Sequence, residues 1–249
     1  LLGRRLASPV PTWEQEIDLY RVPFLGDHRI QEAVVFPGAG YVEMGLAAGR
    51  ELYGDGDYVI RTDDIRFQKA LFIGEEQIVK LRLVFRPDES SFAIFSSQDG
   101  EEWTLHAKGL ARPQHAAKKP TAEWQAMQTR LQTEIARERC YKHFRTMGLE
   151  YGETFQGIGR LWQGELEALA QVTIPTGLID QLHAYHIHPA VLDVCFQVMA
   201  AALPIQEDGA GSVYMPVGVT EGFVYRALSD KLWIRAVIHE QDEQGLLGD

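Results

Sequence analysis

The sequence predicts a duplicated α+β fold in which each half contributes one apolar helix followed by several antiparallel strands. In the first half, helical periodicity over residues 38–53 precedes strand-like alternation. The same order of one helix and then strands recurs after residue 149. No residue-level repeat accompanies this order, so the duplication is inferred from the order of the elements alone. The 249 residues are enough for one large domain or two domains of ordinary size.

Residues 1–112 are expected to form the first half, built around a helix from Gly38 to Tyr53. Pro37 and Gly38 mark the entrance of this helix. Apolar or small residues recur at the spacing of one buried helix face, at Val42, Leu46, Gly49 and Tyr53.

Strands are predicted after this helix because apolar and polar residues alternate over residues 79–85. Residues 91–97 and 103–111 repeat the pattern. Gln98-Asp-Gly100 between them is a hairpin turn signal.

Residues 113–133 are predicted to be a surface linker, and residues 134–249 the second half. A highly charged helix is expected over residues 123–145. The remaining elements follow the order of the first half: a strand near 169–174, a helix over 189–203, and strands over 213–219, 222–226 and 231–239. The chain stops at Asp249 within a hairpin, so a last strand is expected to be missing.

Composition narrows the classes of function. The net charge is −11, which argues against a nucleic-acid partner because phosphate binding needs a basic surface. No apolar run approaches the roughly 18 residues that span a bilayer. The opening Leu-Leu-Gly-Arg-Arg-Leu6 is too short and too basic for a signal peptide. Two distant cysteines suggest reduced thiols. We therefore expect a soluble, cytoplasmic protein without a membrane or nucleic-acid partner.

His28 is the first candidate for chemistry because it precedes a strand-like run that turns into a helix at Pro37-Gly38. The free N–H groups at such a helix end can polarise a thioester carbonyl. A neutral imidazole nearby could then remove the α-proton. The alternative interpretation is that Asp27-His28 forms only a loop or cap pair.

Asp193 is the second candidate, in the segment that starts at His188-Pro189. Pro189 suits the first position of a helix, and Gln197 lies four residues after Asp193 on the same face. The face is otherwise small and apolar, so desolvation would raise the pKa of Asp193 and let it hold a proton. Alternatively, Asp193 merely interacts with the helix dipole. Together, a base and an acid would suffice for β-elimination, without metal, flavin or nicotinamide.

At these residues the sequence resembles the dehydratase domain of modular type I polyketide synthases. The segment from His28 to Pro37 resembles the family motif His-x-x-x-Gly-x-x-x-x-Pro. His188-Pro189, Asp193 and Gln197 resemble the second motif, His-Pro-x-x-x-Asp with Gln or His four residues on. Between them, the segment from Tyr151 to Gln156 is similar to the family's Tyr-Gly-x-x-Phe-Gln. The resemblance covers nearly the whole chain, in order.

The resemblance implies a double hot-dog fold, with each long helix wrapped by an antiparallel sheet. It implies that a β-hydroxyacyl thioester loses water to give an α,β-unsaturated thioester, with His28 as general base and Asp193 as general acid. The substrate would arrive on the phosphopantetheine arm of an acyl carrier protein, with no cofactor or metal in this domain. Neighbouring synthase domains and a homodimer are also implied. The residues implied to bind substrate or support the site are Gln197, Tyr151, Gly152, Phe155, Pro37, Gly38 and Pro189.

Glu32 departs from the family pattern, which has glycine at this position. Glycine there suggests a backbone with positive φ or close packing. Glutamate would then carry a conformational cost, or the local path would differ. Its carboxylate could also lie near His28.

Several alternatives stay open. A domain of the same fold could also cyclise its product by oxa-conjugate addition, or shift the double bond. A hot-dog thioesterase or an inactive acyl-binding module are further possibilities. His183, His186 and His188 lack the accompanying ligand pattern of a metal site. A basic cluster could receive the acidic carrier protein or be a solvated helix face; its members are Arg137, Arg139, Lys142 and Arg145.

Overall fold

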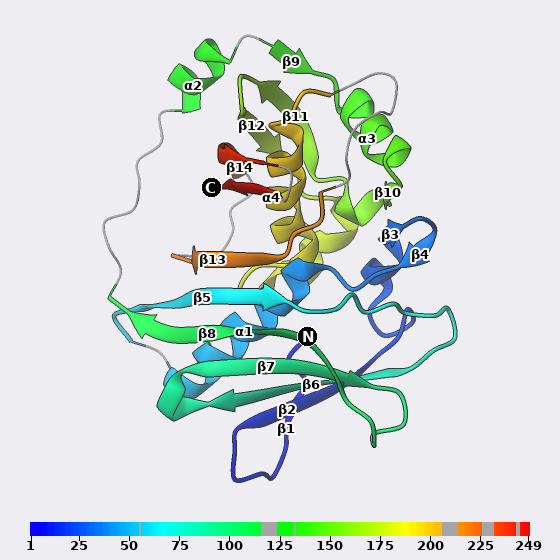
Figure 1. The fold of residues 1–249 in the computed structure, drawn as a ribbon, viewed down its shortest axis with the longest axis vertical. Coiled ribbons are helices and arrows are strands. Elements are labelled where there is room, and N and C mark those ends of the chain that lie inside the picture. Colours follow the sequence, from blue (N-terminus) through cyan, green and yellow to red (C-terminus); the bar gives the residue numbers. More distant parts are fainter. Residues whose placement is uncertain (55, 116–123, 132, 206–213, 226–231, 243–244) are drawn as a thin grey trace.

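The computed structural model of the chain has two lobes, each with a sheet packed against one helix (Figure 1). It describes residues 1–54, 56–115, 124–131, 133–205, 214–225, 232–242 and 245–249. The helices are α1 (Gly38–Tyr53), α2 (Trp124–Arg130), α3 (Arg137–Thr146) and α4 (Pro189–Ala201). Short 3₁₀ turns are η1 (Pro23–Asp27), η2 (Pro87–Glu89), η3 (Glu153–Phe155) and η4 (Thr176–Ala184).

A seven-stranded antiparallel sheet covers α1 in the first lobe. Its strands, in spatial order, are β1 (Arg4–Arg5), β2 (Thr12–Ile17), β6 (Val79–Arg86), β7 (Ser91–Ser97), β8 (Thr104–Gln114), β5 (Val59–Phe67) and β13 (Gly218–Phe223). The predicted helix over residues 38–53 and the three predicted strands after it are confirmed. Alternate residues of β6 are buried, as the period of two requires of a sheet with one face on the core.

The second lobe packs a five-stranded antiparallel sheet against α4. Its strands, in spatial order, are β15 (Leu246–Gly248), β14 (Leu232–Gln241), β12 (Glu167–Val172), β11 (Ile158–Gln163) and β9 (Thr133–Ile135). The predicted helix from Pro189 is confirmed and ends at Ala201. Each lobe has its own cluster of buried apolar side chains.

The two lobes are joined by strands that pair across the boundary. Strand β13 follows α4 in the chain, yet it pairs with β5 at the edge of the first lobe's sheet. A small third sheet orders β10 (Leu149–Tyr151), β3 (His28–Ile30) and β4 (Ala33–Val34). The helices α1 and α4 also contact each other. Segments from both halves therefore meet where the candidate residues lie.

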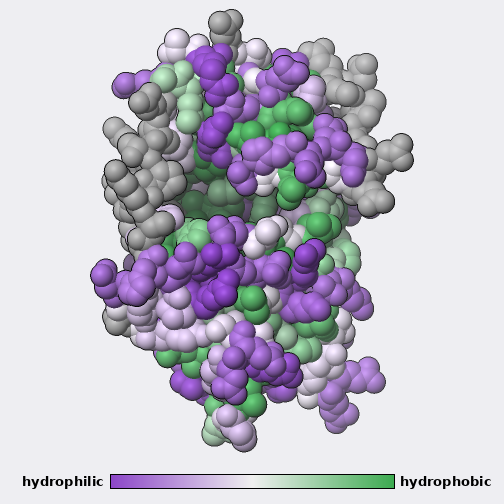
Figure 2. Space-filling view, turned by 60° about the vertical axis from the view of Figure 1, so that its left-hand side comes forward, coloured by the Kyte–Doolittle hydropathy of each residue, from purple (hydrophilic) through white to green (hydrophobic). Residues whose placement is uncertain are grey.

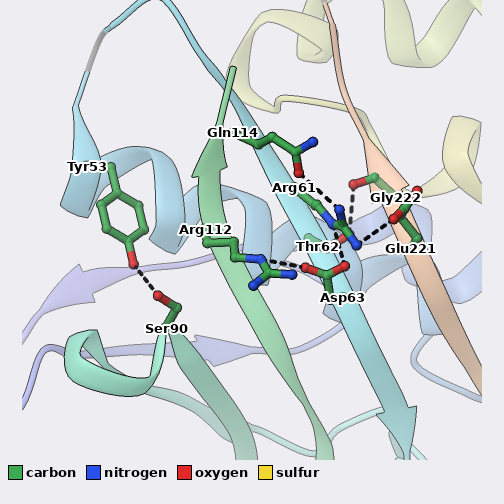
Figure 3. A network of polar contacts seen from close by, with 9 residues as sticks. All are labelled: Tyr53, Arg61, Thr62, Asp63, Ser90, Arg112, Gln114, Glu221 and Gly222. Atoms are coloured by element: carbon green, nitrogen blue, oxygen red, sulfur yellow. Dashed lines mark hydrogen bonds and ion pairs between the residues drawn. The ribbon is translucent and has the colours of Figure 1, made fainter. Parts of the chain in front are cut away.

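Polar contacts reinforce the attachment of β13 to β5 (Figure 3). The guanidinium of Arg61 forms ion pairs with both Asp63 of its own strand and Glu221 of β13. Asp63 is buried and also accepts a hydrogen bond from Nε of Arg112, at 3.0 Å. A single carboxylate thus ties β5 to β8, and Arg61 extends the network to β13.

The single helix expected over residues 123–145 is wrong. In the described part of this range, α2 and α3 are separated by β9, which pairs with the edge of β11. Thr133 and Ile135 are β-branched and fit a strand. Glu134 pairs with Arg160 on the neighbouring strand, with Oε1 and Nε 2.8 Å apart. Residues 133–135 therefore pair with the edge of the sheet, although the charge pattern around them predicted a helix. Within the predicted linker, residues 116–123 and 132 lie outside the described residues.

The two strands expected over residues 213–219 and 222–226 are, where described, the single strand β13. Continuous pairing with β5 runs from Gly218 to Phe223, so no turn divides it. Pro216 has no backbone N–H, which is consistent with a strand that starts after it. Residues 213, 226 and 231 of the predicted strands lie outside the described part. None of the helices in the described residues has the length and apolar character needed to cross a membrane.

Candidate active site

His28 and Asp193 lie 165 positions apart in sequence but face each other in the structure, with Nε2 and Oδ1 3.8 Å apart. His28 is the first residue of β3, and its side chain is buried. Its Nδ1 lies 2.8 Å from the backbone carbonyl of Val35. Because a carbonyl oxygen can only accept, we assign the ring proton to Nδ1. The lone pair of Nε2 then faces Asp193, as a proton acceptor requires.

The hairpin that carries His28 turns at Gln31 and Glu32, whose φ angles are 47° and 70°. Ile30 and Ala33 pair directly across this two-residue loop. Two central residues with positive φ define a type I′ turn, which favours glycine at its second position. Of the alternatives expected for this position, the structure shows the positive φ. The Glu32 side chain is exposed, whereas His28 is buried.

Asp193 is the fifth residue of α4, and only 3% of its surface is exposed. Burial raises the pKa of Asp193, as predicted, whereas a positive charge on His28, when that ring is protonated, and a hydrogen bond from Gln197 act in the opposite direction. Desolvation disfavours the ionised carboxylate. The environment therefore shifts Asp193 toward its protonated form, which can donate a proton.

Gln197 holds the carboxyl of Asp193 from the next turn of α4. Its Nε2 donates to Oδ2 of Asp193 at 3.0 Å and to the carbonyl of Phe155 at 3.0 Å. Its Oε1 accepts from the hydroxyl of Tyr141 at 3.2 Å. The Tyr141 oxygen in turn accepts the backbone N–H of Ile158 at 2.9 Å. The amide is thus bound at both ends, and its orientation is determined by its partners.

Tyr141 is a site residue that the sequence prediction missed. It lies on the buried face of α3, with Cys140 and Phe144. The spacing of these apolar residues could have indicated that face. Nothing in the spacing indicates that the Tyr141 hydroxyl reaches Gln197 on another helix.

The Tyr151 segment forms one wall beside His28. Tyr151 pairs with His28 across β10 and β3, and their ring centroids are 5.8 Å apart. The ring of Phe155 lies 5.0 Å from that of His28. Gly152 donates its N–H to the carbonyl of Asp27 at 2.7 Å. A Cβ on Gly152 would lie 2.2 Å from Oδ1 of Asp27, so a side chain at this position would displace the residue next to His28.

The three remaining predicted residues lie at helix starts. Pro37 caps α1 and Gly38 is its first residue, where a Cβ would come within 2.8 Å of the Phe67 ring. Pro189 is the first residue of α4, after the capping residue His188. The side chain of His188 accepts a backbone N–H from the first turn. The two helices that frame the site therefore both begin at a proline-containing junction.

The site has the chemical requirements of an acid–base pair. An unprotonated imidazole nitrogen can take a proton from one carbon, and a neighbouring protonated carboxyl can donate one to an oxygen on the next carbon. Aromatic rings flank His28, so the pair lies in a largely apolar surrounding. Between the two lobes, Figure 2 shows a hollow with hydrophobic walls.

Two family profiles match the chain. One, described as the polyketide synthase dehydratase domain, matches residues 1–97, and the other, described as the polyketide synthase dehydratase N-terminal domain, matches residues 119–249. A mycocerosic acid synthase-like polyketide synthase of Mycobacterium tuberculosis is 32% identical over 88% of this chain. Polyketide synthase PksM of Bacillus subtilis is 28% identical over 84% of it. The chain spans only 11% and 5% of these proteins, respectively. Both are therefore far longer than this chain.

Solved structures agree with the sequence matches. The dehydratase domain from the CurF module of the curacin polyketide synthase has a TM-score of 0.87 and 29% identity, over 99% of this chain and 94% of that one. The dehydratase from the CurK module has a TM-score of 0.88 and 28% identity, over 100% and 93%. Inactive CurK variants have also been solved, one with a histidine replaced by phenylalanine and one with an aspartate replaced by asparagine.

The fold and the family profiles lead to the same assignment. The two lobes, each a helix against an antiparallel sheet, are the halves of a double hot-dog fold. The profiles together match most of the chain. The chain belongs to the polyketide synthase dehydratase family, whose members are hydro-lyases that remove water from β-hydroxyacyl thioesters.

Proposed function

We propose that His28 and Asp193 carry out this dehydration as general base and general acid. The observation that carries the proposal is the 3.8 Å separation of Nε2 and Oδ1 within a buried site. His28 would remove the α-proton, and the electron pair of the broken C–H bond would form the double bond. Asp193 would protonate the departing β-hydroxyl, which leaves as water. The resulting imidazolium can return a proton to the carboxylate and restore both groups.

The supporting residues have distinct proposed roles. The N–H of Gly38, at the start of α1 after Pro37, would bind the thioester carbonyl, where a helix N-terminus favours developing negative charge. Gln197 orients the acid. Tyr151, Phe155 and Pro189 would shape the surroundings of the two reacting groups, and Gly152 keeps the backbone close to Asp27.

The inactive CurK variants lend support to this assignment. In that dehydratase, which has 26% to 28% identity to this chain in its three structures, inactive variants replace one histidine or one aspartate. A histidine and an aspartate are also the two residues that the present site brings together. The corresponding changes here are His28→Phe and Asp193→Asn.

We propose an acyl carrier protein as the partner, with the substrate on its phosphopantetheine arm and no cofactor bound in this domain. The great length of the relatives supports a position for the chain beside other synthase domains. Within such a multienzyme the chain would act as a homodimer in the cytoplasm. Its two cysteines are free thiols, as expected for that compartment. The basic residues predicted for docking are exposed on α3, the helix that also carries the buried Tyr141. A carrier protein bound there would lie close to the site.

Turnover of a β-hydroxyacyl thioester on a carrier protein tests the proposal, with both epimers at the β-carbon. We expect one epimer to lose one water and to form an unsaturated thioester. We expect no product from His28→Phe or Asp193→Asn, although both variants remain folded. Wild-type turnover by both variants would contradict the assignment of the two residues.

The product distinguishes the alternative activities in the same experiment. A cyclic ether would indicate an additional cyclase, and an unsaturated product with a displaced double bond would indicate an isomerase. Release of the free acid would indicate a thioesterase. Binding of the thioester without any conversion would indicate an inactive acyl-binding module.

A further inference from the structure

Glu43 is a buried carboxylate that connects the two lobes and is not one of the reacting pair. It lies in the second turn of α1, and only 3% of its surface is exposed. Its Oε1 accepts the backbone N–H of His186 at 3.0 Å, and its Oε2 accepts that of Ile187 at 3.1 Å. Both carboxylate oxygens of Glu43, in the first lobe, thus accept hydrogen bonds from consecutive peptide groups of the second lobe.

The environment makes this pair of hydrogen bonds unusual. Burial raises the pKa of Glu43 to about 7, whereas the two backbone N–H groups favour its charged form. An acidic residue is rarely this buried unless it is paired or hydrogen-bonded. Apolar residues at the same position would satisfy the core but leave both N–H groups without this acceptor. Glutamate at this position therefore links α1 to the backbone of residues 186–187 by hydrogen bonds, which an apolar side chain cannot do.

The contact is placed directly before the helix that carries the acid. His186 and Ile187 are followed by the cap of α4 at His188 and by its first residue, Pro189. Asp193 lies one turn further along the same helix. A shift of residues 186–187 would therefore displace the start of α4 and the carboxyl of Asp193 with it.

The other end of the contact leads back to the base. Glu43 is one turn into α1, which begins directly after Pro37. Val35, two residues before that proline, accepts the Nδ1 proton of His28. Glu43 therefore completes a frame that runs from His28 through Val35 and α1 to α4 and Asp193.

We propose that Glu43 is a positioning residue that holds α4 against α1 at the distance at which Asp193 meets His28. The inference rests on the proposed function, because it assigns those two residues as the reacting pair. A purely structural role would affect the stability of the fold alone. A positioning role also affects the chemical step, because catalysis depends steeply on the geometry of the reacting groups.

The test compares Glu43→Gln with a matched variant, Glu167→Gln. Glu167 is also a buried carboxylate that accepts two sets of hydrogen bonds, from Arg130 and Arg235 in the second lobe. Glutamine keeps one acceptor oxygen but presents an NH₂ group where the second acceptor was. Both variants should therefore melt at a lower temperature than the wild type. Kinetics are then measured at a temperature at which all three proteins are folded.

We expect Glu43→Gln to lower kcat by roughly 10-fold to 100-fold, with KM changed by no more than about twofold. Glu43→Ala, which loses both acceptors, should lower kcat further if it folds. Glu167→Gln should keep the wild-type kcat. Equal kcat values for wild type, Glu43→Gln and Glu167→Gln would overturn the inference.

A second readout does not depend on turnover. The nitrogen NMR shift of His28 Nε2 reports how closely the Asp193 carboxyl approaches. At a fixed pH, Glu43→Gln should move this shift toward the value in Asp193→Asn, whereas Glu167→Gln should not. If the wild type fails to dehydrate any β-hydroxyacyl thioester, the proposed function fails, and the shift still decides whether Glu43 positions α4. An unchanged shift in Glu43→Gln would count against it.

Discussion

Nε2 of Gln197 donates to Oδ2 of Asp193 at 3.0 Å, so Oδ2 is an acceptor and the acidic proton of Asp193 belongs on Oδ1. Oδ1 is the atom that faces Nε2 of His28. The same side-chain atom of Gln197 also contacts the carbonyl of Phe155. Because a carbonyl can only accept, this atom must be the amide nitrogen. The hydrogen-bond network thus directs the proton of Asp193 toward Nε2 of His28.

Removal of the Tyr141 hydroxyl should weaken this control. In Tyr141→Phe, Oε1 of Gln197 loses its donor and the buried N–H of Ile158 loses its acceptor. We expect the free energy of unfolding to fall by about 1–3 kcal/mol, as for a buried polar group left unpaired. Because the Gln197 amide can then rotate, kcat should fall by roughly 10-fold.

Tyr53→Phe is the matched control for Tyr141→Phe. Its hydroxyl also forms a hydrogen bond, to Ser90 at 3.0 Å, but at the far end of α1 (Figure 3). Tyr53→Phe should leave kcat unchanged. Equal kcat values for the two variants would show that the orientation of Gln197 does not limit the reaction.

Asp193→Asn should abolish dehydration and, at neutral pH, stabilise the fold. Burial raises the pKa of Asp193 in the folded state above the ordinary value of 3.8. The unfolded chain therefore releases this proton first, and the carboxyl lowers stability as pH rises from 3.8 toward its folded pKa. The asparagine variant should gain in melting temperature relative to wild type across that window. Thermal melts from acidic to neutral pH measure the difference.

Asp99→Asn should show the opposite pH dependence. Asp99 is exposed, and hydrogen bonds from the backbone N–H groups of Glu101 and Glu102 lower its pKa. Its carboxylate therefore contributes stability above the ordinary pKa, and this contribution disappears as pH falls through the lowered value. The same trend in both variants would contradict the raised pKa of Asp193.

Glu32→Gly should stabilise the hairpin that carries His28. The left-handed conformation at Glu32, with φ of 70°, costs a residue with a Cβ about 1 kcal/mol. The gain corresponds to a rise in melting temperature of about 2–4 °C for a chain of this size. Glu32→Ala removes the carboxylate but keeps the Cβ, so it should give no such rise. Equal stabilisation by both changes would point to the charge of Glu32 rather than to its backbone.

Asp63 should be far more important for stability than Glu221, although both bind Arg61 (Figure 3). The side chain of Asp63 is 6% exposed, whereas that of Glu221 is 47% exposed. Asp63→Ala leaves Arg61 and Arg112 without their buried partner and should cost about 3 kcal/mol. Glu221→Gln removes a solvent-screened pair and should cost less than about 1 kcal/mol. Chemical denaturation of the two variants gives both values, and equal losses would disprove the distinction.

The order of helices and strands was predictable because it depends on local periodicity. The helix over residues 38–53 and the alternating strand over residues 79–85 each bury one face, and this leaves a direct trace in the sequence. The prediction failed over residues 123–145, where the pairing of β9 with β11 decides the structure. Such pairing involves residues distant in sequence, and the β-branched Thr133 and Ile135 indicate it too weakly to outweigh the charge pattern.

The sequence by itself determined the fold class, and its ordered motifs singled out His28, Asp193 and Gln197. It also determined that Glu32 replaces a glycine. Only the tertiary structure decided that His28 and Asp193 face each other, that Tyr141 orients Gln197, and that Glu43 joins α1 to the start of α4. The physical reason is that a motif constrains which side chains are available, whereas distances and hydrogen-bond partners arise when the two lobes pack together.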